Sequence, residues 1–519
     1  MKKLLFLFPS LIFLFSNLLH SQVAPGIEWE KCFGGSEFEK AWSIQQTQDG
    51  GYIFAGLASS TDGDVTGNHG EVDYWIVKID ANGNIEWQKC YGGSGQEQAQ
   101  SIEQTTDGGF IIGGISNSTD GDVSNNHGLF DYWIIRLDQS GNLIWGKSFG
   151  GSKNEGVDSN LAWIFGEYPV SVKQTSDGGF IVGGASYSNN GDASGNHGSS
   201  DFWILKLDID GNLVWQKCLG GSEGDYTNSI QQLSDGGYII AGSTNSNDGD
   251  VSSTHGNTDG WIVKLDEDGN KVWEKTYGDT GWDELFSIQE TTDHGLVAAG
   301  RYYCNFWILR LDSIGNIIWN KSHGLGDCDE AHSVQQTKDG FVLGGRGCPS
   351  PNYYNCSFYL IMKYDSAGTF LWEKFMGGSV IDFGFSVDET FDGGYIFGGV
   401  AFSEDGDVTG NHSDQGDAWI VKLAGTQSNI FSPKVISLSL SPNPVQDFVN
   451  IILATSSNDI AIHVYDLRGR KMNPTFSNYQ SQTSNSIQLN TENLPAGFYT
   501  LQIISNKTGV GEVGKFVKE

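Results

Sequence analysis

The chain has 519 residues, with 63 acidic against 30 basic side chains and a formal net charge of −33. Such a surface excludes nucleic-acid binding, which requires clustered Lys and Arg. No apolar stretch beyond the N-terminus approaches the length of a transmembrane helix. We therefore expect a protein with no transmembrane segment and no nucleic-acid partner.

The first 21 residues have the pattern of a secretory signal peptide. Lys2 and Lys3 precede an apolar run from Leu4 to Leu19, and the small Ser21 follows. The run is too short and wrongly flanked for a stable membrane span. Cleavage after Ser21 is predicted, which implies a secreted or surface-displayed protein.

One four-part unit repeats seven times between Gln22 and Leu423. Its marker tryptophans recur at constant spacing, as Trp29, Trp87 and Trp145 show. In the second copy the four parts are 101–105, 110–114, 131–138 and 141–145, and the turn 107–109 separates the first two. Self-similarity of this period indicates a repeat architecture, in which no unit buries its apolar face alone.

Each unit reads as four short strands. The apolar runs are rich in Ile, Val, Tyr, Phe and Trp, and tight turns such as Asp49-Gly50-Gly51 separate them. Four-stranded repeats of this kind are typical of a β-propeller. Residues 27–32 match a fourth strand with no blade before it, and 417–423 match a third strand with no fourth after it. These ends predict an all-β fold, a seven-bladed β-propeller over 22–423 that the N-terminal strand closes; a linear β-solenoid is the alternative.

The loops between second and third strands carry a possible calcium pattern. Residues 62–73 place oxygen-bearing side chains at positions 1, 3, 5 and 12, with Gly at position 6, as calcium loops do. Copies occur at 120–131, 190–201, 248–259 and 405–417, although Asn125 and Ser253 replace the glycine in two of them. The alternative is that these side chains tie the loop through bonds to its backbone. The candidate calcium ligands are Asp62, Asp64, Thr66, Asp73, Asp120, Asp122, Asp131, Asp248, Asp250, Asp259, Asp405 and Asp407.

An acid precedes the first strand of every blade. Because first strands line the channel of a propeller, these acids are expected either to ring its mouth or to specify the fold through hydrogen bonds. A ring of this kind could hold a cation or supply the acid and base of a hydrolase. The seven acids are Glu39, Glu97, Glu167, Asp225, Asp283, Asp329 and Asp382.

Ligand binding is expected where the blades differ. Blade three is entered through an insertion over 153–167, blade five lacks the acidic loop, and blade six substitutes residues 348–356. Exposed Trp, Tyr and Arg are typical of binding sites, although they also pack their own loops. The candidate ligand-binding residues are Trp163, Phe165, Arg301, Tyr302, Tyr303, Tyr353 and Tyr354.

Seven cysteines leave at least one unpaired. Cys348 and Cys356 flank one loop and are predicted to form a disulfide. Cys304 and Cys328 are a second, weaker pair.

The repeat stops at Leu423, and a linker over 424–434 leads to a different β-rich module at 435–519, predicted to be a small Ig-like β-sandwich. It contains 441–444 (Ser-Pro-Asn-Pro), 462–470 (Ile-His-Val-Tyr-Asp-Leu-Arg-Gly-Arg), 494–503 and a closing 514–518. These motifs, in this order, resemble the type A sorting domain of the Bacteroidetes type IX secretion system. The resemblance implies export by that machinery and release or surface anchoring. Residues 207–215 also resemble the tryptophan-docking repeat of quinoprotein-type propellers, a likeness of structure alone.

The sequence favours a secreted or cell-surface propeller that acts as a binding or adhesion module for a glycan or protein ligand. Calcium, if bound, would stiffen loops. The alternatives are a polysaccharide-active hydrolase or lyase that uses the channel-mouth carboxylates, and a spacer without ligand. No nucleophile–base motif or metal-ligand cluster stands out.

Overall fold

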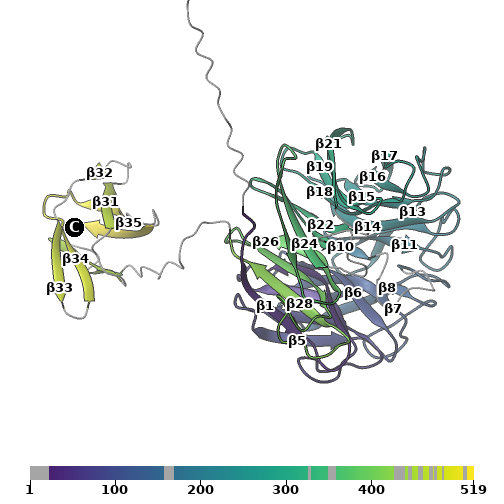
Figure 1. Ribbon diagram of the computed structural model, residues 1–519, viewed down its shortest axis with the longest axis horizontal. Coiled ribbons are helices and arrows are strands. Elements are labelled where there is room, and N and C mark those ends of the chain that lie inside the picture. Colours follow the sequence, from purple (N-terminus) through teal and green to yellow (C-terminus); the bar gives the residue numbers. More distant parts are fainter. Residues whose placement is uncertain are drawn as a thin grey trace, which may run out of the picture. The chain divides into compact units, whose positions relative to one another are not determined.

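The computed structural model describes residues 23–156, 169–324, 329–348 and 358–425, and in the C-terminal part 439–441, 447–453, 460–466, 471–472, 476–481, 484–505 and 511–518. The chain divides into two compact units, Met1–Thr426 and Gln427–Glu519. Within the described ranges every helix-or-strand element is a β-strand (Figure 1).

The first unit consists of seven four-stranded antiparallel sheets. Blades one to three comprise β2(Glu39–Gln46), β3(Tyr52–Ala58), β4(Asp73–Ile79), β5(Ile85–Tyr91); β6(Glu97–Gln104), β7(Phe110–Ser116), β8(Asp131–Leu137), β9(Leu143–Phe149); and β10(Ser171–Gln174), β11(Phe180–Ser186), β12(Asp201–Leu207), β13(Leu213–Leu219). Blades four and five comprise β14(Asp225–Gln232), β15(Tyr238–Thr244), β16(Asp259–Leu265), β17(Lys271–Tyr277); and β18(Asp283–Glu290), β19(Leu296–Tyr302), β20(Asn305–Leu311), β21(Ile317–His323). Blades six and seven comprise β22(Glu330–Thr337), β23(Gly340–Gly347), β24(Phe358–Asp365), β25(Phe370–Met376); and β26(Asp382–Glu389), β27(Tyr395–Ala401), β28(Asp417–Leu423), β1(Ile27–Phe33).

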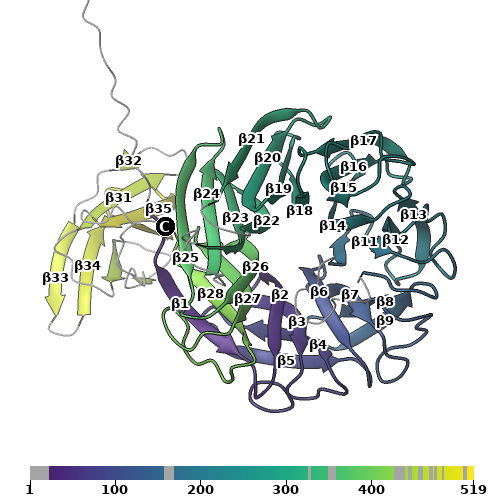
Figure 2. The same ribbon diagram turned by 45° about the vertical axis from the view of Figure 1, so that its right-hand side comes forward.

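The sheets stand around a central channel as a seven-bladed propeller (Figure 2). The first strand of each blade lies innermost, and strands such as β5, β9 and β13 lie at the rim. The N-terminal strand β1 pairs antiparallel with β28, so that Cys32 lies opposite Trp419. The predicted closure by the N-terminal strand is therefore confirmed, and it removes the open sheet edges that a linear array would expose.

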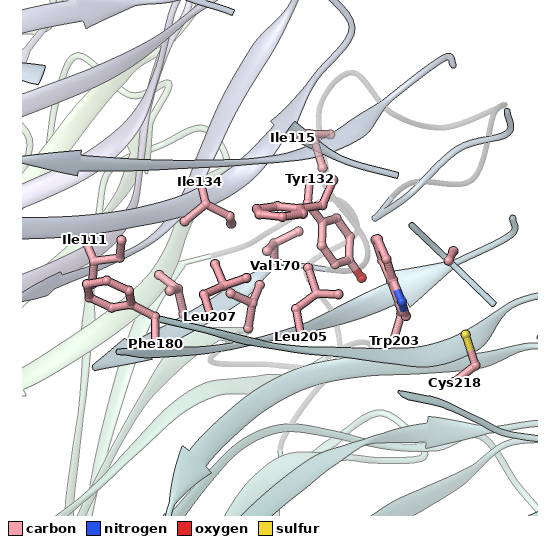
Figure 3. Packing of buried hydrophobic residues seen from close by; sticks show 14 residues of the cluster. Ile111, Ile115, Tyr132, Ile134, Val170, Phe180, Trp203, Leu205, Leu207 and Cys218 are labelled. Carbon is pink, nitrogen blue, oxygen red and sulfur yellow. The ribbon is translucent and has the colours of Figure 1, made fainter. Parts of the chain in front are cut away.

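Apolar side chains fill the spaces between neighbouring blades. Between blades two and three, Ile111, Tyr132 and Ile134 pack against Phe180 and Trp203 (Figure 3). The ring centroids of Tyr132 and Trp203 are 4.8 Å apart. The Tyr132 hydroxyl donates to the carbonyl of Ala185 at 3.1 Å, so the polar end of this buried ring is satisfied. Both faces of each blade are buried, which explains the near-continuous apolar runs of the middle strands.

A second contact joins the blades at their rims, as the tryptophan-docking resemblance suggests. The ring of Trp87 on β5 lies against Gly141, in the turn between β8 and β9 of the next blade. A Cβ at Gly141 would come within 2.9 Å of that ring, and the φ of 73° also favours glycine. The same contact recurs at Gly83, Gly211, Gly269, Gly315 and Gly368. The repeating Trp and Gly therefore join neighbouring blades at their outer strands.

The second unit consists of two four-stranded antiparallel sheets. One is ordered β29(Ser439–Ser441), β30(Phe448–Leu453), β34(Ser484–Asn490), β33(Phe476–Ser481), and the other β32(Lys471–Met472), β31(Ile460–Asp466), β35(Gly497–Ser505), β36(Gly511–Lys518). Val464, Leu489 and Leu501 are fully buried in this unit.

Candidate functional site

The acids that precede the first strands do not ring the channel mouth. Glu39 is fully buried, and its carboxylate accepts hydrogen bonds from the backbone N–H groups of Gly35 at 2.8 Å and Ser60 at 2.9 Å. Five equivalents are buried to the same degree: Glu97, Asp225, Asp283, Asp329 and Asp382. Of the two expected roles, fold specification therefore holds for these acids and the channel-mouth ring does not, because the buried carboxylates bond the loops of their own blades.

In blade three, Glu155 is the acid that makes these hydrogen bonds to the loops. Its buried carboxylate accepts from Gly151 N–H at 3.3 Å and from the Ser186 hydroxyl at 3.1 Å. Burial, with the charge of Asp131 adding to it, raises the pKa of Glu155 to about 8. The assignment of this role to Glu167 was wrong, because the insertion follows the acid instead of preceding it; Glu167 lies outside the described residues.

The carboxylates of the acidic loops also serve as hydrogen-bond acceptors. In blade one, Asp62 accepts from Ser36 N–H at 2.8 Å and Asp64 from Gly34 N–H at 3.3 Å. Asp73 is buried and accepts from the backbone N–H and ring Nδ1 of His69 at 2.9 and 2.6 Å. The same bonds recur at Asp120, Asp122, Asp131, Asp248, Asp250, Asp259, Asp405 and Asp407. Over the described ranges no group of three or more His, Cys, Asp or Glu is placed to hold a metal ion. Bound calcium stays a prediction.

Two positions shared by almost every first strand join neighbouring blades around the channel. Ser43 Oγ accepts from the N–H of Ile102 in the next blade at 3.4 Å, and Gln45 Oε1 accepts from the N–H of Gln104 at 3.0 Å. At the closure, Asp388 accepts from the N–H of Gln46 at 2.8 Å. The inward-facing N–H groups of these edge strands are therefore capped by side chains of the ring itself.

The positions that differ between blades lie on a cavity of about 840 Å³ within the channel. This volume is in the range of pockets that hold a drug-sized ligand, roughly 300–1,000 Å³. On one side, over blades two to four, the lining is mostly polar: it includes Gln100, Tyr226 and Asn228, with the charged Glu103 and Lys173. On the other side, over blades five to seven and one, it is aromatic and charged: Trp42, Trp282, Glu284, Phe286, Arg301, Glu330, His332, Arg346 and Phe385.

The charged part of the cavity centres on Glu330. Its carboxylate receives Arg301 Nη1 at 2.8 Å on one oxygen, and Arg346 Nε and Nη2, both at 2.8 Å, on the other. His332 Nε2 lies 3.2 Å from that second oxygen, and Arg301 also contacts Glu284 at 3.0 Å. Although burial opposes it, bonding from His332 and the nearby Arg346 lower the pKa of Glu330 to about 2. Glu330 is thus a fixed anion that orients two guanidinium groups at the cavity wall.

Aromatic rings continue the wall beside this cluster. The His332 ring stacks on Phe286 with centroids 4.8 Å apart, and the Trp42 and Phe385 centroids are 4.4 Å apart. Behind them the buried ammonium of Lys40 lies 3.4 Å from the Trp42 ring centroid. Burial, with the charge of Arg346 adding to it, holds the pKa of Lys40 well below its usual range.

Only part of the predicted ligand-binding set is described. Arg301 lines the cavity, whereas Tyr302 and Tyr303 do not. The Tyr302 hydroxyl bonds Asp279, and its ring packs on Trp307 at 5.7 Å, so it stabilises its own blade. Trp163, Phe165, Tyr353 and Tyr354 lie outside the described residues.

The cysteines divide into bonded and free thiols. Cys348 forms a disulfide, and the predicted partner Cys356 lies outside the described residues. Cys304 is an exposed free thiol, so the pairing of Cys304 with Cys328 was wrong. It lies in the tight turn between β19 and β20.

Comparison with curated protein sequences finds no match. Among solved structures, the chain resembles Sqt1 from Chaetomium thermophilum at a TM-score of 0.41 and 10% identity, over 76% of this chain and 100% of that chain. A WD40 domain of SCAP from fission yeast aligns at 0.30 and 7%, over 94% and 90%. A mutant NanB sialidase from Streptococcus pneumoniae aligns at 0.38 and 10%, over 77% and 70%. Similarities this distant carry no conclusion about ligand or activity.

The C-terminal unit gives the informative match. Residues 439–519 match the family described as the secretion system C-terminal sorting domain. No helix in the described ranges is long and apolar enough to cross a membrane. The match to the sorting domain makes the chain a cargo of the type IX secretion system. This system exports the seven-bladed propeller to the outside or the surface of the cell.

Proposed function

We propose that the exported propeller binds a saccharide in its channel cavity. The observation that carries the proposal is the placement of the blade differences. The serine shared by all first strands lines the cavity and joins neighbouring blades, whereas the positions beside it differ and make one side of the same cavity aromatic and charged. A ring of seven similar blades does not need one side of its channel to differ from the other in order to be stable.

The chemistry of the wall favours a saccharide. Sugar rings present apolar C–H faces, which pack on Trp and Phe, and hydroxyl groups, which bond planar polar side chains. Phe286, Phe385 and Trp42 offer rings, while Arg301 and Arg346 are held in place by Glu330. Gln100 and Asn228 lie on the other side of the same cavity, but both are buried and their amides bond the ring itself: Gln100 Oε1 accepts from Val170 N–H and Asn228 Nδ2 donates to the carbonyl of Leu285, each at 2.9 Å.

An extended peptide fits the channel less well. Peptides that add to a sheet edge need free backbone N–H and C=O groups along that edge. Here the N–H groups of Ile44 and Gln46 are taken by Ser386 and Asp388 of the neighbouring blade, at 3.2 and 2.8 Å. Recognition in the cavity therefore depends on side chains.

The test is a glycan array probed with the secreted full chain, followed by calorimetry on the best glycan. Phe286→Ala removes a ring from the cavity wall. Phe391→Ala removes one that is 73% exposed, in the turn between β26 and β27, and does not line the cavity. The proposal expects loss of binding for Phe286→Ala only, with both melting temperatures preserved within a few degrees. Equal affinity in both variants would overturn it.

A further inference from the structure

Blade five differs from most other blades in the connection between its second and third strands, which lies beside residues that line the channel cavity. In five blades a long loop joins the second and third strands, over 59–72, 117–130, 187–200, 245–258 and 402–416. In blade five the equivalent connection is the two-residue turn 303–304 between β19 and β20. Blade five therefore lacks the long loop that these five blades carry, close to Trp282 and Arg301 of the cavity lining; we call this place the blade-five notch.

An exposed tryptophan lies at the blade-five notch. Trp282 immediately precedes β18, is 61% exposed, and lines the same cavity as Phe286 and Trp42. The ring of Tyr303 lies against Gly281, the residue before Trp282, and is 44% exposed. An exposed indole is unfavourable in water unless something covers it, and large exposed aromatics are typical of binding surfaces.

Aromatic side chains follow one another from the blade-five notch along the wall of the channel cavity. Trp282 and Tyr303 lie at the notch, and Phe286, His332, Phe385 and Trp42 follow along the cavity wall. Successive contacts within the channel join Phe286 to His332 at 4.8 Å, His332 to Phe385 at 5.4 Å, and Phe385 to Trp42 at 4.4 Å between centroids. Such a series offers stacking positions at several points along one path.

Resting on the proposed saccharide binding, we infer that the ligand is a linear oligosaccharide or polysaccharide chain end. One end lies in the channel between Phe286 and Trp42, and the following units leave through the blade-five notch across Trp282. The cavity of about 840 Å³ holds more than one sugar ring, and blade five lacks the long loop that the other five described connections carry.

The test measures affinity for homologous ladders of one to six units of xylo-, cello-, manno- and galacturono-oligosaccharides, using the full chain. The native protein is expected to bind longer members more tightly until the chain passes Trp282. Trp282→Ala is expected to remove the gain at the longer lengths, a loss of about tenfold, which corresponds to ~1.4 kcal/mol. Trp282→Phe should restore most of it, and the shortest bound member should be unaffected by either change.

The outcomes separate this inference from the proposed function. Binding without dependence on chain length, or an equal loss at all lengths in Trp282→Ala, would overturn the exit path and leave saccharide binding intact. If no ladder or array glycan binds while a peptide library does, both the inference and the proposed function are wrong. Trp282 is exposed, so a fold defect in its variants is not expected, and a melting curve checks this.

Discussion

Arg346 donates to a single oxygen of Glu330 through both Nε and Nη2, each at 2.8 Å. The pair lies in the wall of the channel cavity, and Arg301 binds the other oxygen of the same carboxylate. Because Glu330 is only 5% exposed, these contacts hold an ion cluster largely out of water. Replacement of Glu330 is therefore expected to change the stability of the fold.

Glu330→Gln is expected to lower the free energy of unfolding by about 2–4 kcal/mol, because it removes the buried anion that Arg346 and Arg301 share and leaves Arg301 with the more exposed Glu284. Urea denaturation of the full chain measures this. Glu284→Gln is the matched control, since Glu284 is 20% exposed and pairs with the same Arg301 at 3.0 Å. An equal effect of the two changes would contradict the central place of Glu330 in the cluster.

Glu155 predicts a pH dependence of stability. Its pKa is raised from 4.5 to about 8 in the folded protein, so folding favours the protonated carboxyl. Stability attributable to this group is greatest below about pH 4.5, falls as pH rises towards 8, and reaches its minimum above that. Glu155→Gln should flatten this part of the pH profile in thermal melts. The exposed Glu223→Gln should leave the profile unchanged, and a native-like slope in Glu155→Gln would show that the dependence arises elsewhere.

The rim contact between Trp87 and Gly141 predicts a specific glycine requirement. Gly141→Ala must accept both a positive φ and a ring 2.9 Å from the new Cβ. Gly67 has a φ of 85° with nothing within 4 Å, so Gly67→Ala meets the backbone cost alone, about 1–2 kcal/mol. Denaturation should show the larger loss for Gly141→Ala. Equal losses would mean that the indole moves aside freely.

Calcium in the acidic loops has its own test. An ion that binds only the native state raises the melting temperature by mass action. The prediction is that a chelator lowers the melting temperature and that added calcium restores it, with magnesium as the control. An unchanged melting temperature in saturating calcium would leave the Asp carboxylates with the backbone bonds seen in the structure as their sole role.

Much of the fold could be predicted from the sequence, because the repeat determines the strand pattern and the two half-units at the ends determine the closure. Residues 27–32 and 417–423 belong to β1 and β28, which pair as expected. The direction of a side chain could not be predicted in the same way. For Glu39 the sequence allowed both a channel-mouth ring and hydrogen bonds to the loop backbone, and the folded loop shows that its oxygens accept from the N–H groups of Gly35 and Ser60.

The candidate site was largely missed, although a signal was present. Attention to surface loops selected Arg301 but not Trp42, Phe286 or His332, which lie within regular strands. Aligned first strands show that the fourth position differs from blade to blade, whereas the following serine is constant. This position, the one directly before the serine, carries Trp42, Gln100, Val170, Asn228, Phe286, His332 and Phe385. Because strands alternate between faces, variation at such a position indicates a surface that the fold leaves unconstrained.

The most direct test of the account is a crystal structure of the full chain with its best array glycan bound. We predict sugar density in the channel cavity, against Phe286 and within hydrogen-bonding distance of Arg301 or Arg346. Density confined to the outer loops or to the rim strands, with the channel cavity holding only solvent, would contradict saccharide recognition in the channel.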